Sequence, residues 1–463
     1  MDGAVMTNPY LRGNFAPVRT EDDFELAVTG EIPEGLRGTL YRNGPNPQFE
    51  PRDPNHHWFL GDGMIHAFRV EDGKVVYRNR YVRTPKWTLE NAAGRSLFGA
   101  WGNPMTTDRS AMGQDSGAAN TNIVWHAGRL LALEEGHMPF ELAPGTLDPR
   151  GYAQAYGGRV TAHPKIDPVT GEMVWFAYSA GETPLNARVA YGVTDAKGEV
   201  VRRDVFEAPY ASMVHDFLVT ERFALFPILP LTGSIERAMS GRPAYAWEPE
   251  KGAFVGVMRR DADVSTIRWF NAGPCYVFHP MNAWEEGEKI HADVMRYERA
   301  PLFPNPDGSP GRPCGARLVR WTFDLAGGSD AVVETPLEDL MGEFPRFDER
   351  RAGLPYRHGW YAADTRDSDT IKMNAIAHID LQAGRRQVWE LPAGDFASEP
   401  VFTPRTADAP EGEGWLTTVI YRGAEDRSDF VVLDAQDVAR GPIATAALPR
   451  RVPFGFHGNW VPG

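Results

Sequence analysis

The chain has 463 residues, of which 62 are acidic and 48 are basic, so its net charge is −14. This acidic balance argues against a nucleic-acid-binding protein, because such a protein needs a basic surface. Hydrophobic residues make up 42% of the chain and aromatic residues 11%, which excludes a disordered chain and provides for a large core.

The compartment and the domain organisation follow from what the sequence lacks. The two cysteines, Cys275 and Cys314, cannot form a disulfide framework and make no CxxC motif. The first residues carry no basic segment followed by an apolar run, and no run of 18 apolar residues is present. We therefore expect a cytoplasmic protein that forms one domain over residues 1–463.

In chain order, the sequence consists of short runs rich in Val, Ile, Phe, Tyr and Trp between turns that contain glycine or proline. Such runs are typical of β-strands, and two runs around an acidic or glycine turn predict a hairpin. Hairpins are predicted at 65–81, 165–178, 318–334, 375–391 and 415–434. Residues 89–117 are the least strand-like and predict a helix and loop that lie over one face as a lid. Many short strands favour an all-β propeller over a pair of sandwiches, with about 40–50 residues per blade.

Four of the 12 histidines lie in apolar surroundings: His163, His215, His279 and His457. His215 and His279 fall in runs predicted as strands, Met213–Val219 and Cys275–Ala283, and His457 falls in a glycine-flanked turn. Strand ends and tight turns near a propeller axis can direct side chains into a central channel, where four imidazoles could share one metal. Taken singly, each is better explained as a core histidine that is hydrogen-bonded to a backbone carbonyl.

A second metal hypothesis rests on His378-Ile379-Asp380. An H-x-D pair and a distant histidine form the facial triad of iron oxygenases. Because the pair ends a predicted strand just before a glycine turn, Asp380 is also expected there as an ordinary turn residue.

Several motifs resemble the carotenoid cleavage oxygenases, a family that includes enzymes that cleave stilbenes and phenylpropenoids. The resemblance runs from Asn8 to the C-terminus. It is carried by the segments at 40–47, 57–64, 119–122, 161–164, 343–346, 398–402 and 456–458, which read LYRNGPNP, HWFLGDGM, ANTN, TAHP, EFPR, SEPVF and FHG.

The resemblance implies a seven-bladed β-propeller capped by a dome of loops. It also implies Fe(II) on the propeller axis, bound by His163, His215, His279 and His457. Three glutamates, Glu135, Glu343 and Glu399, are then expected to accept hydrogen bonds from His215, His279 and His457, whereas His163 has no glutamate partner. Such carboxylates fix the ring orientation and raise ligand basicity.

The implied activity is that of a dioxygenase that uses O2 to split a conjugated C=C bond of an apolar substrate into two carbonyl products. The sequence contains no Rossmann or P-loop motif. A non-oxidative isomerase, as found in this family, and a metal-free binding propeller are the alternatives. We expect no obligate protein partner.

The substrate pocket is expected to involve Phe59, Trp101 and Glu134. The family members that act on 4-hydroxystilbenes typically carry Tyr and Lys at the positions of Trp101 and Glu134, where they grip and deprotonate a phenol. Trp has no hydroxyl and Glu repels a phenolate, so an apocarotenoid or related polyene ranks slightly ahead of a stilbenoid or phenylpropenoid substrate.

Further aromatic residues, among them Trp87, Phe98, Phe140, Phe278, Phe344 and Phe456, could line a tunnel or belong to the ordinary core. Leu97, Phe98, Trp101 and Met105 on the lid could form an apolar patch for peripheral membrane contact, or could pack onto the propeller.

Overall fold

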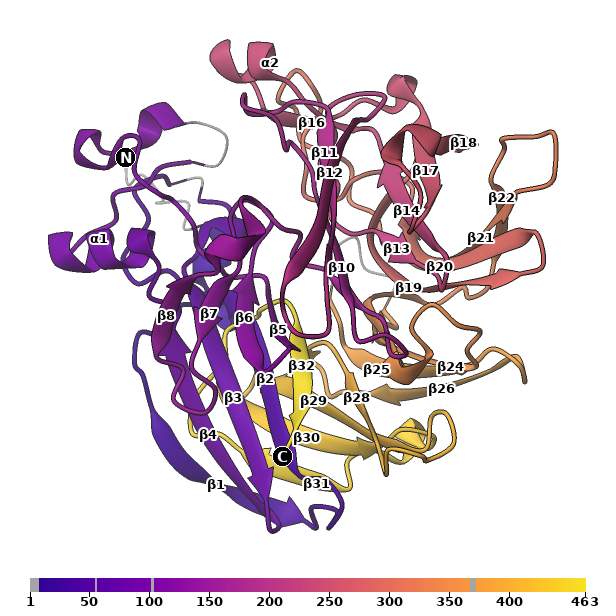
Figure 1. The fold of residues 1–463 in the computed structure, drawn as a ribbon. Coiled ribbons are helices and arrows are strands. Elements are labelled where there is room, and N and C mark those ends of the chain that lie inside the picture. The colour runs from indigo at the N-terminus through magenta and orange to yellow at the C-terminus, as the bar shows by residue number, and fades with distance from the viewer. Residues whose placement is uncertain (1–7, 55, 101–103, 367–371) are drawn as a thin grey trace.

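The computed structural model describes residues 8–54, 56–100, 104–366 and 372–463, and most of its regular structure is β-strand (Figure 1). All the paired strands are antiparallel, as expected for sheets built from successive hairpins. The five hairpins predicted from the sequence are confirmed by the strand pairing.

Five sheets of the described part of the chain contain four strands each. In chain order they comprise β5 (Asn122–His126), β6 (Arg129–Leu133), β7 (Phe140–Leu142) and β8 (Pro149–Tyr152); β9 (Lys165–Ile166), β10 (Met173–Ala177), β11 (Arg188–Thr194) and β12 (Val200–Glu207); β13 (Leu218–Val219), β14 (Phe223–Ile228), β17 (Ala253–Arg259) and β18 (Arg268–Ala272); β19 (Tyr276–Glu286), β20 (Lys289–Tyr297), β21 (Arg317–Asp324) and β22 (Val333–Pro336); and β23 (Met341–Phe347), β24 (His358–Asp364), β25 (Ala375–Asp380) and β26 (Arg385–Glu390). A separate hairpin joins β15 (Leu231–Gly233) to β16 (Tyr245–Trp247).

The two ends of the chain meet in a larger sheet, which has ten strands among the described residues (Figure 1). It comprises β1 (Asp23–Gly30), β2 (Gly38–Pro45), β3 (Gly63–Glu71), β4 (Lys74–Tyr81), β27 (Phe396–Ala397), β28 (Val401–Pro404), β29 (Gly414–Arg422), β30 (Arg427–Asp434), β31 (Ala444–Ala447) and β32 (Gly458–Pro462). The C-terminal strand β32 pairs with β2 and so joins the end of the chain to its beginning.

The expectation of seven blades is wrong, because the described residues form five four-stranded blades and the ten-stranded sheet. The reason lies in β1, which pairs with two different strands. Its first half, Asp23–Leu26, pairs with β4, and its second half, from Ala27 to Gly30, pairs with β31. One strand therefore joins the N-terminal and C-terminal strands into a continuous sheet.

The two halves of the ten-stranded sheet also share one hydrophobic core. Phe68 of β3 and Phe430 of β30 stack with their ring centroids 5.0 Å apart, and both are fully buried beside Trp415 and Leu26. Burial of each such aromatic side chain contributes about 1.5–3 kcal/mol, so the closure of the chain is stabilised by packing as well as by strand pairing.

The strands that position the site lie at the inner edges of the sheets. Each blade has its first strand at an edge. Among these edge strands β13, β19 and β23 contact one another in that order, and the series of contacts continues through β28 and β32 of the ten-stranded sheet to β5. Residues on or beside these strands therefore face a common axis, although they are far apart in the sequence.

Helices are few in the described part of the chain. The helix α1 (Pro85–Ala93) begins at Thr84, whose Oγ1 accepts a hydrogen bond from the amide of Trp87, and ends at Gly94 in the left-handed conformation, φ 65°. The other helix, α2 (Ile235–Met239), follows β15. No helix formed by the described residues has the length and apolar character needed to cross a membrane.

Candidate metal centre

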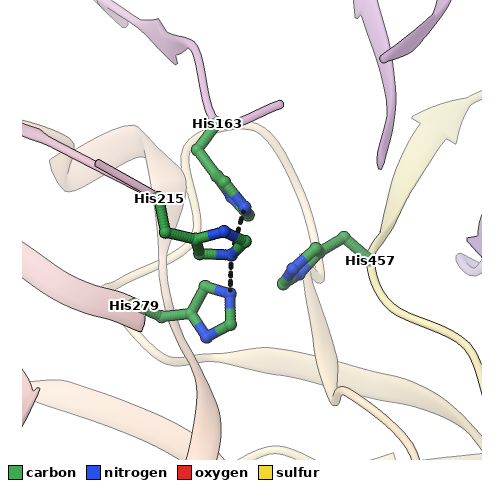
Figure 2. Close-up of side chains that lie close together, drawn as sticks. All are labelled: His163, His215, His279 and His457. Carbon is green, nitrogen blue, oxygen red and sulfur yellow. Dashed lines mark hydrogen bonds between the residues drawn. The ribbon is translucent and has the colours of Figure 1, made fainter. Parts of the chain in front are cut away.

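Four buried imidazole rings converge at the axis (Figure 2). They belong to His163, His215, His279 and His457, whose exposed fractions are between 5% and 9%. The Nε2 atom of His215 lies 3.1 Å from Nε2 of His163 and 3.1 Å from Nε2 of His279. One nitrogen from each of the four rings lies within 4.8 Å of the others.

The four rings reach the axis from different local structures. His279 lies in β19 as predicted, but the prediction of a strand around His215 is wrong, since His215 lies in an irregular segment before β13. His163 lies just before β9, and its amide donates to Oγ1 of Thr161. His457 lies just before β32, and its amide donates to the carbonyl of Thr121.

A glutamate stands behind each of three rings and accepts a hydrogen bond from its Nδ1 atom. His215 donates to Glu135, His279 donates to Oε2 of Glu343 at 2.5 Å, and His457 donates to Oε1 of Glu399 at 3.0 Å. Because a carboxylate only accepts, these bonds place the proton on Nδ1 and leave the lone pair of Nε2 pointing inward.

The three glutamates are themselves held by different groups. The hydroxyl of Tyr178 donates to Oε2 of Glu135 at 2.6 Å. A guanidinium nitrogen of Arg346 lies 3.3 Å from Oε2 of Glu399, and the amide of Gly458 donates to the same atom at 2.8 Å. These contacts limit the rotation of the carboxylates and, through them, of the rings.

Glu343 is placed by a break in its strand. The register of β23 shifts between Glu343 and Arg346, and Phe344 adopts the left-handed region at φ 54°. The amide of Phe344 donates to Oε2 of Glu343 at 2.6 Å. Backbone strain of this kind costs about 1–3 kcal/mol and persists only where the surrounding contacts hold the backbone in that conformation. Here it accompanies the hydrogen bond that His279 donates to Glu343.

His163 differs from the other three rings. The carboxylate nearest to its Nδ1 is Asp216, at 3.8 Å, which is too long for a hydrogen bond. Asp216 is instead held by Nζ of Lys165 at 2.7 Å and by the amide of Phe217 at 2.6 Å. Sequence reasoning missed the ion pair of the buried Asp216 with Lys165, although Asp216 directly follows His215 in the chain.

Burial and charge set the protonation of these groups. Burial, together with the three neighbouring rings, holds the pKa of His163 well below its usual range, so this ring is neutral. Burial would raise the pKa of Glu399, but Arg346 and His457 lower it to about 2. For His215, burial acts to lower the pKa and Glu135 outweighs it, so the pKa is raised.

The donor set fits a metal ion. When both rings are neutral and carry the proton on Nδ1, the Nε2 atoms of His215 and His279, 3.1 Å apart, both present lone pairs, so neither can donate to the other. Two nitrogens about 2.1 Å from one ion and at right angles to each other would be about 3.0 Å apart. A cation between the rings therefore accounts for both the spacing and the buried lone pairs.

The rings of His215, His279 and His457 line a cavity of about 530 Å³. The aromatic part of its lining includes Phe59, Phe98, Phe278, Phe344 and Phe456, together with Trp58. Trp87 and Phe140 do not line it, and Phe140 belongs to the core under β5–β7. The predicted pocket residue Trp101 lies outside the described residues.

A profile of the family described as retinal pigment epithelial membrane protein matches residues 15–462 of this chain. The chain belongs to the carotenoid cleavage oxygenase family. It is 42% identical to the isoeugenol monooxygenase of Pseudomonas nitroreducens over 98% of each chain, and 35% identical to a carotenoid cleavage oxygenase of Mycobacterium tuberculosis over 99% of this chain and 98% of that one. The crystal structure of Pseudomonas brassicacearum lignostilbene dioxygenase superposes with a TM-score of 0.95, at 35% identity over 98% of this chain and 99% of that one.

The helix α1 and the loop after it cover part of the cavity of this oxygenase. Nζ of Lys86 contacts Asp62 at 2.6 Å and Glu90 at 2.8 Å, and all three side chains are buried. Oε1 of Glu90 also accepts hydrogen bonds from the amides of Leu97 and Phe98. Leu97 is buried and packs inward, whereas Met105 is 77% exposed. The lid is therefore tied to the propeller by buried charges.

Glu134 lines the cavity, and its contact with His137 was not expected from the sequence. Its Oε1 atom pairs with Nδ1 of His137, three residues later, in an ion pair. His137 also lines the cavity. The sequence offered only the i, i+3 spacing as a signal, and a turn brings the two side chains together.

The alternative site at His378 and Asp380 does not join the four rings. His378 hydrogen-bonds to His358, with 3.0 Å between Nε2 and Nδ1, and Asp380 is paired with Arg357. Within the described residues, the group that could hold a metal comprises His163, His215, His279 and His457.

Proposed function

We propose that this protein is a non-haem Fe(II) dioxygenase that cleaves a conjugated C=C bond of an apolar substrate into two carbonyl products. The observation that carries the proposal is the convergence of four buried imidazoles. Three of them, which are backed by glutamates, lie on the wall of a cavity whose lining includes several aromatic side chains. The named activities of its relatives, isoeugenol monooxygenase and carotenoid cleavage oxygenase, support the same reaction class.

In this proposal His163, His215, His279 and His457 are the ligands of the iron. Neutral imidazoles suit Fe(II), and three of the four are oriented by Glu135, Glu343 and Glu399. When bound, Fe(II) supplies the redox chemistry that allows O2 to react with an alkene. The protein orients the rings, holds their protons on Nδ1 and surrounds the alkene with apolar side chains.

Phe59, Trp101 and Glu134 are proposed to contact the substrate. Phe59 stands edge-on to Phe456, with centroids 5.5 Å apart, beside the ligand His457. A flat conjugated chain fits against such rings, since aromatic faces and edges pack closely with π systems. The carboxylate of Glu134 would repel a phenolate, which favours a polyene of the apocarotenoid type.

A stilbene or phenylpropenoid is the second candidate substrate class. It is favoured by the TM-score of 0.95 against lignostilbene dioxygenase and by the 42% identity to isoeugenol monooxygenase. Both candidates share the alkene-cleaving reaction and differ only in what occupies the cavity.

The test is turnover of a small panel, an apocarotenal, a stilbene and a phenylpropenoid, by protein with one iron per chain. We expect two carbonyl products from at least one member, and with 18O2 we expect label in both. Product formation without O2 would indicate a non-oxidative isomerase. Iron-loaded protein that consumes no O2 with any member of the panel would overturn the proposal.

The substrate assignment has its own test in the double variant Trp101→Tyr/Glu134→Lys. If these two positions contact the substrate, the variant should gain cleavage of 4-hydroxystilbenes relative to the wild type. An unchanged ratio of stilbene to apocarotenal turnover would remove both residues from the pocket assignment.

A further inference from the structure

Arg42 is a buried cation that the proposed reaction does not use. It lies in β2 opposite Gly458 of β32, the residue after the proposed ligand His457, and it is 4% exposed. Its Nη1 atom donates to the carbonyl of Pro453 at 3.2 Å, whereas Nε and Nη2 have no hydrogen-bond partner among the described residues. Burial lowers the pKa of Arg42 to about 10, so the guanidinium is still charged at neutral pH. A buried cation without an ion pair of its own is costly, and its retention calls for an explanation.

The turn that leads to His457 fixes the place of this guanidinium. A Cβ atom at Gly455 would lie 3.2 Å from Nη2 of Arg42, so the glycine lets the cation lie directly against the backbone of the turn. Glu399 lies nearby, since it accepts hydrogen bonds from His457 and from the amide of Gly458, and its negative charge stabilises the guanidinium. Arg42 is therefore held close to one of the three glutamates of the candidate metal centre.

A second guanidinium reaches the same glutamate. Nη1 of Arg346 lies 3.3 Å from Oε2 of Glu399 and donates to the carbonyl of Gly458 at 2.9 Å. Nη2 of Arg346 donates to Oδ1 of Asn459 at 3.0 Å. The side chain of Arg346 is only 12% exposed, so solvent and salt screen its charge weakly.

The other two glutamates are held by neutral donors. Glu135 accepts a hydrogen bond from the hydroxyl of Tyr178, and Glu343 accepts one from the amide of Phe344. With Fe(II) bound, the charge of the ion and the three carboxylates would sum to +2 − 3 = −1. The two guanidinium groups beside Glu399 change this sum to +1, and the buried charges are thus concentrated on one side of the centre.

We propose that Arg42 and Arg346 keep the iron in the ferrous state by raising its Fe(III)/Fe(II) reduction potential. The loss of one electron from Fe(II) adds a positive charge to the centre, and buried cations nearby make this loss less favourable. The inference rests on the proposed function, because it takes the four imidazoles to bind iron. In the proposed reaction the alkene supplies all four electrons that O2 accepts, so turnover itself provides no electron to return Fe(III) to Fe(II).

The test is the reduction potential of the full-length, iron-loaded protein, from a mediated redox titration that follows the EPR signal of Fe(III). Arg42→Met and Arg346→Met should each lower the potential by about 59 mV, a tenfold shift of the equilibrium toward Fe(III). Arg42→Lys keeps the charge but not the planar fork of donors, and it should retain the wild-type potential.

Arg320→Met is the matched control for the removal of a cation. Arg320 pairs with the buried Asp293 on β20, and its own strand, β21, is two strands away from the inner strand β19. This variant should therefore keep the wild-type potential. Urea unfolding identifies any variant that does not fold, and Arg346→Lys with Arg346→Met gives the same comparison if Arg42→Met is lost.

Wild-type potentials in the methionine variants overturn the proposal. A drop in Arg42→Lys as large as that in Arg42→Met also overturns it, because the effect would then come from packing and not from charge. Lowered potentials in a protein that cleaves no alkene overturn the proposed function and leave the role of the two arginines standing. Unchanged potentials in a protein that cleaves alkenes do the reverse, and a protein that binds no iron overturns both.

Discussion

The protein contains two clusters of buried histidines, and they differ in where their ring nitrogens point. In the four-histidine cluster, three rings direct Nδ1 outward to glutamates and Nε2 inward. In the other cluster, His358 and His378 hydrogen-bond to each other at 3.0 Å, and both stack on Trp360.

Burial and proximity do not distinguish the two clusters, because His358 and His378 are 5% and 4% exposed. His358 and His378 hydrogen-bond to each other. The nearby carboxylate of Glu411 accepts hydrogen bonds from the backbone amides of Arg357 and His358 rather than from a ring nitrogen. The comparison indicates that carboxylates behind three of the four rings, which direct the lone pairs of Nε2 inward, distinguish the candidate metal site from the other cluster.

The largest expected difference comes from removing one ring of each cluster. His215→Ala should abolish alkene cleavage and reduce the bound metal below one ion per chain, because it removes a ligand and leaves one oxygen of Glu135 without its donor. His378→Gln should keep both properties. Elemental analysis of the two purified variants checks this, and loss of metal from His378→Gln would break the distinction.

The next effect concerns the carboxylates. Glu343→Gln should weaken metal affinity about 10–100-fold, because an amide holds the ring of His279 less firmly and makes it less basic. Glu411→Gln is the matched control in the other cluster and should leave the affinity unchanged. Competition with a chelator measures both, and equal affinities for the two variants would show that the carboxylate behind the ring is unimportant.

The pH dependence of stability separates the clusters in a third way. Burial, together with His358, lowers the pKa of His378 from 6.5 to about 4. Between pH 6.5 and pH 4 the unfolded chain therefore binds more protons than the folded chain, so stability is lost as the pH falls through this range. At pH 5 the loss is about 2 kcal/mol, from about 1.5 pH units at 1.36 kcal/mol each.

Urea unfolding of metal-free wild type and His378→Gln at pH 7 and pH 5 tests this prediction. Because the two proteins differ at one ring only, the histidines that do not contact His378 contribute equally to both. The wild type should lose about 2 kcal/mol more than the variant between the two pH values. Identical losses would mean that His378 does not titrate in this range.

The smallest expected effect is that of Asp380→Asn. Arg357, the partner of Asp380, is 44% exposed, so the loss of the ion pair should cost no more than about 1 kcal/mol of unfolding free energy. Metal content should not change, because Asp380 faces Arg357 and the turn amide of Ala383. Loss of metal from this variant would revive the facial-triad hypothesis for His378 and Asp380.

Much of the local structure was predictable from the sequence. The five predicted hairpins form because each combines two apolar runs with a turn whose residues favour reversal, and such contacts are local. The strand around His279 was predicted for the same reason. The segment around His215 resembles a strand in composition but remains irregular, because it has to turn toward the axis before β13.

The number of blades was not predictable, because it depends on which strands pair rather than on where strands form. β1 is divided between β4 and β31, and nothing in the composition of Asp23–Gly30 signals two partners. The ion pair of Glu134 with His137 and the position of Asp216 beside His163 were missed for a related reason. Side-chain direction in a turn or an irregular segment follows from the backbone around it.

The sequence by itself determined the all-β class, the family and the residues available as ligands, because strand patterns, turn chemistry and motifs are local properties of the chain. Only the tertiary structure decided that four histidines separated by up to 294 positions, 457 minus 163, share one centre while His378 does not. The physical reason is that edge strands of different sheets meet at one axis, and their order around that axis depends on the long-range pairing that closes the ring.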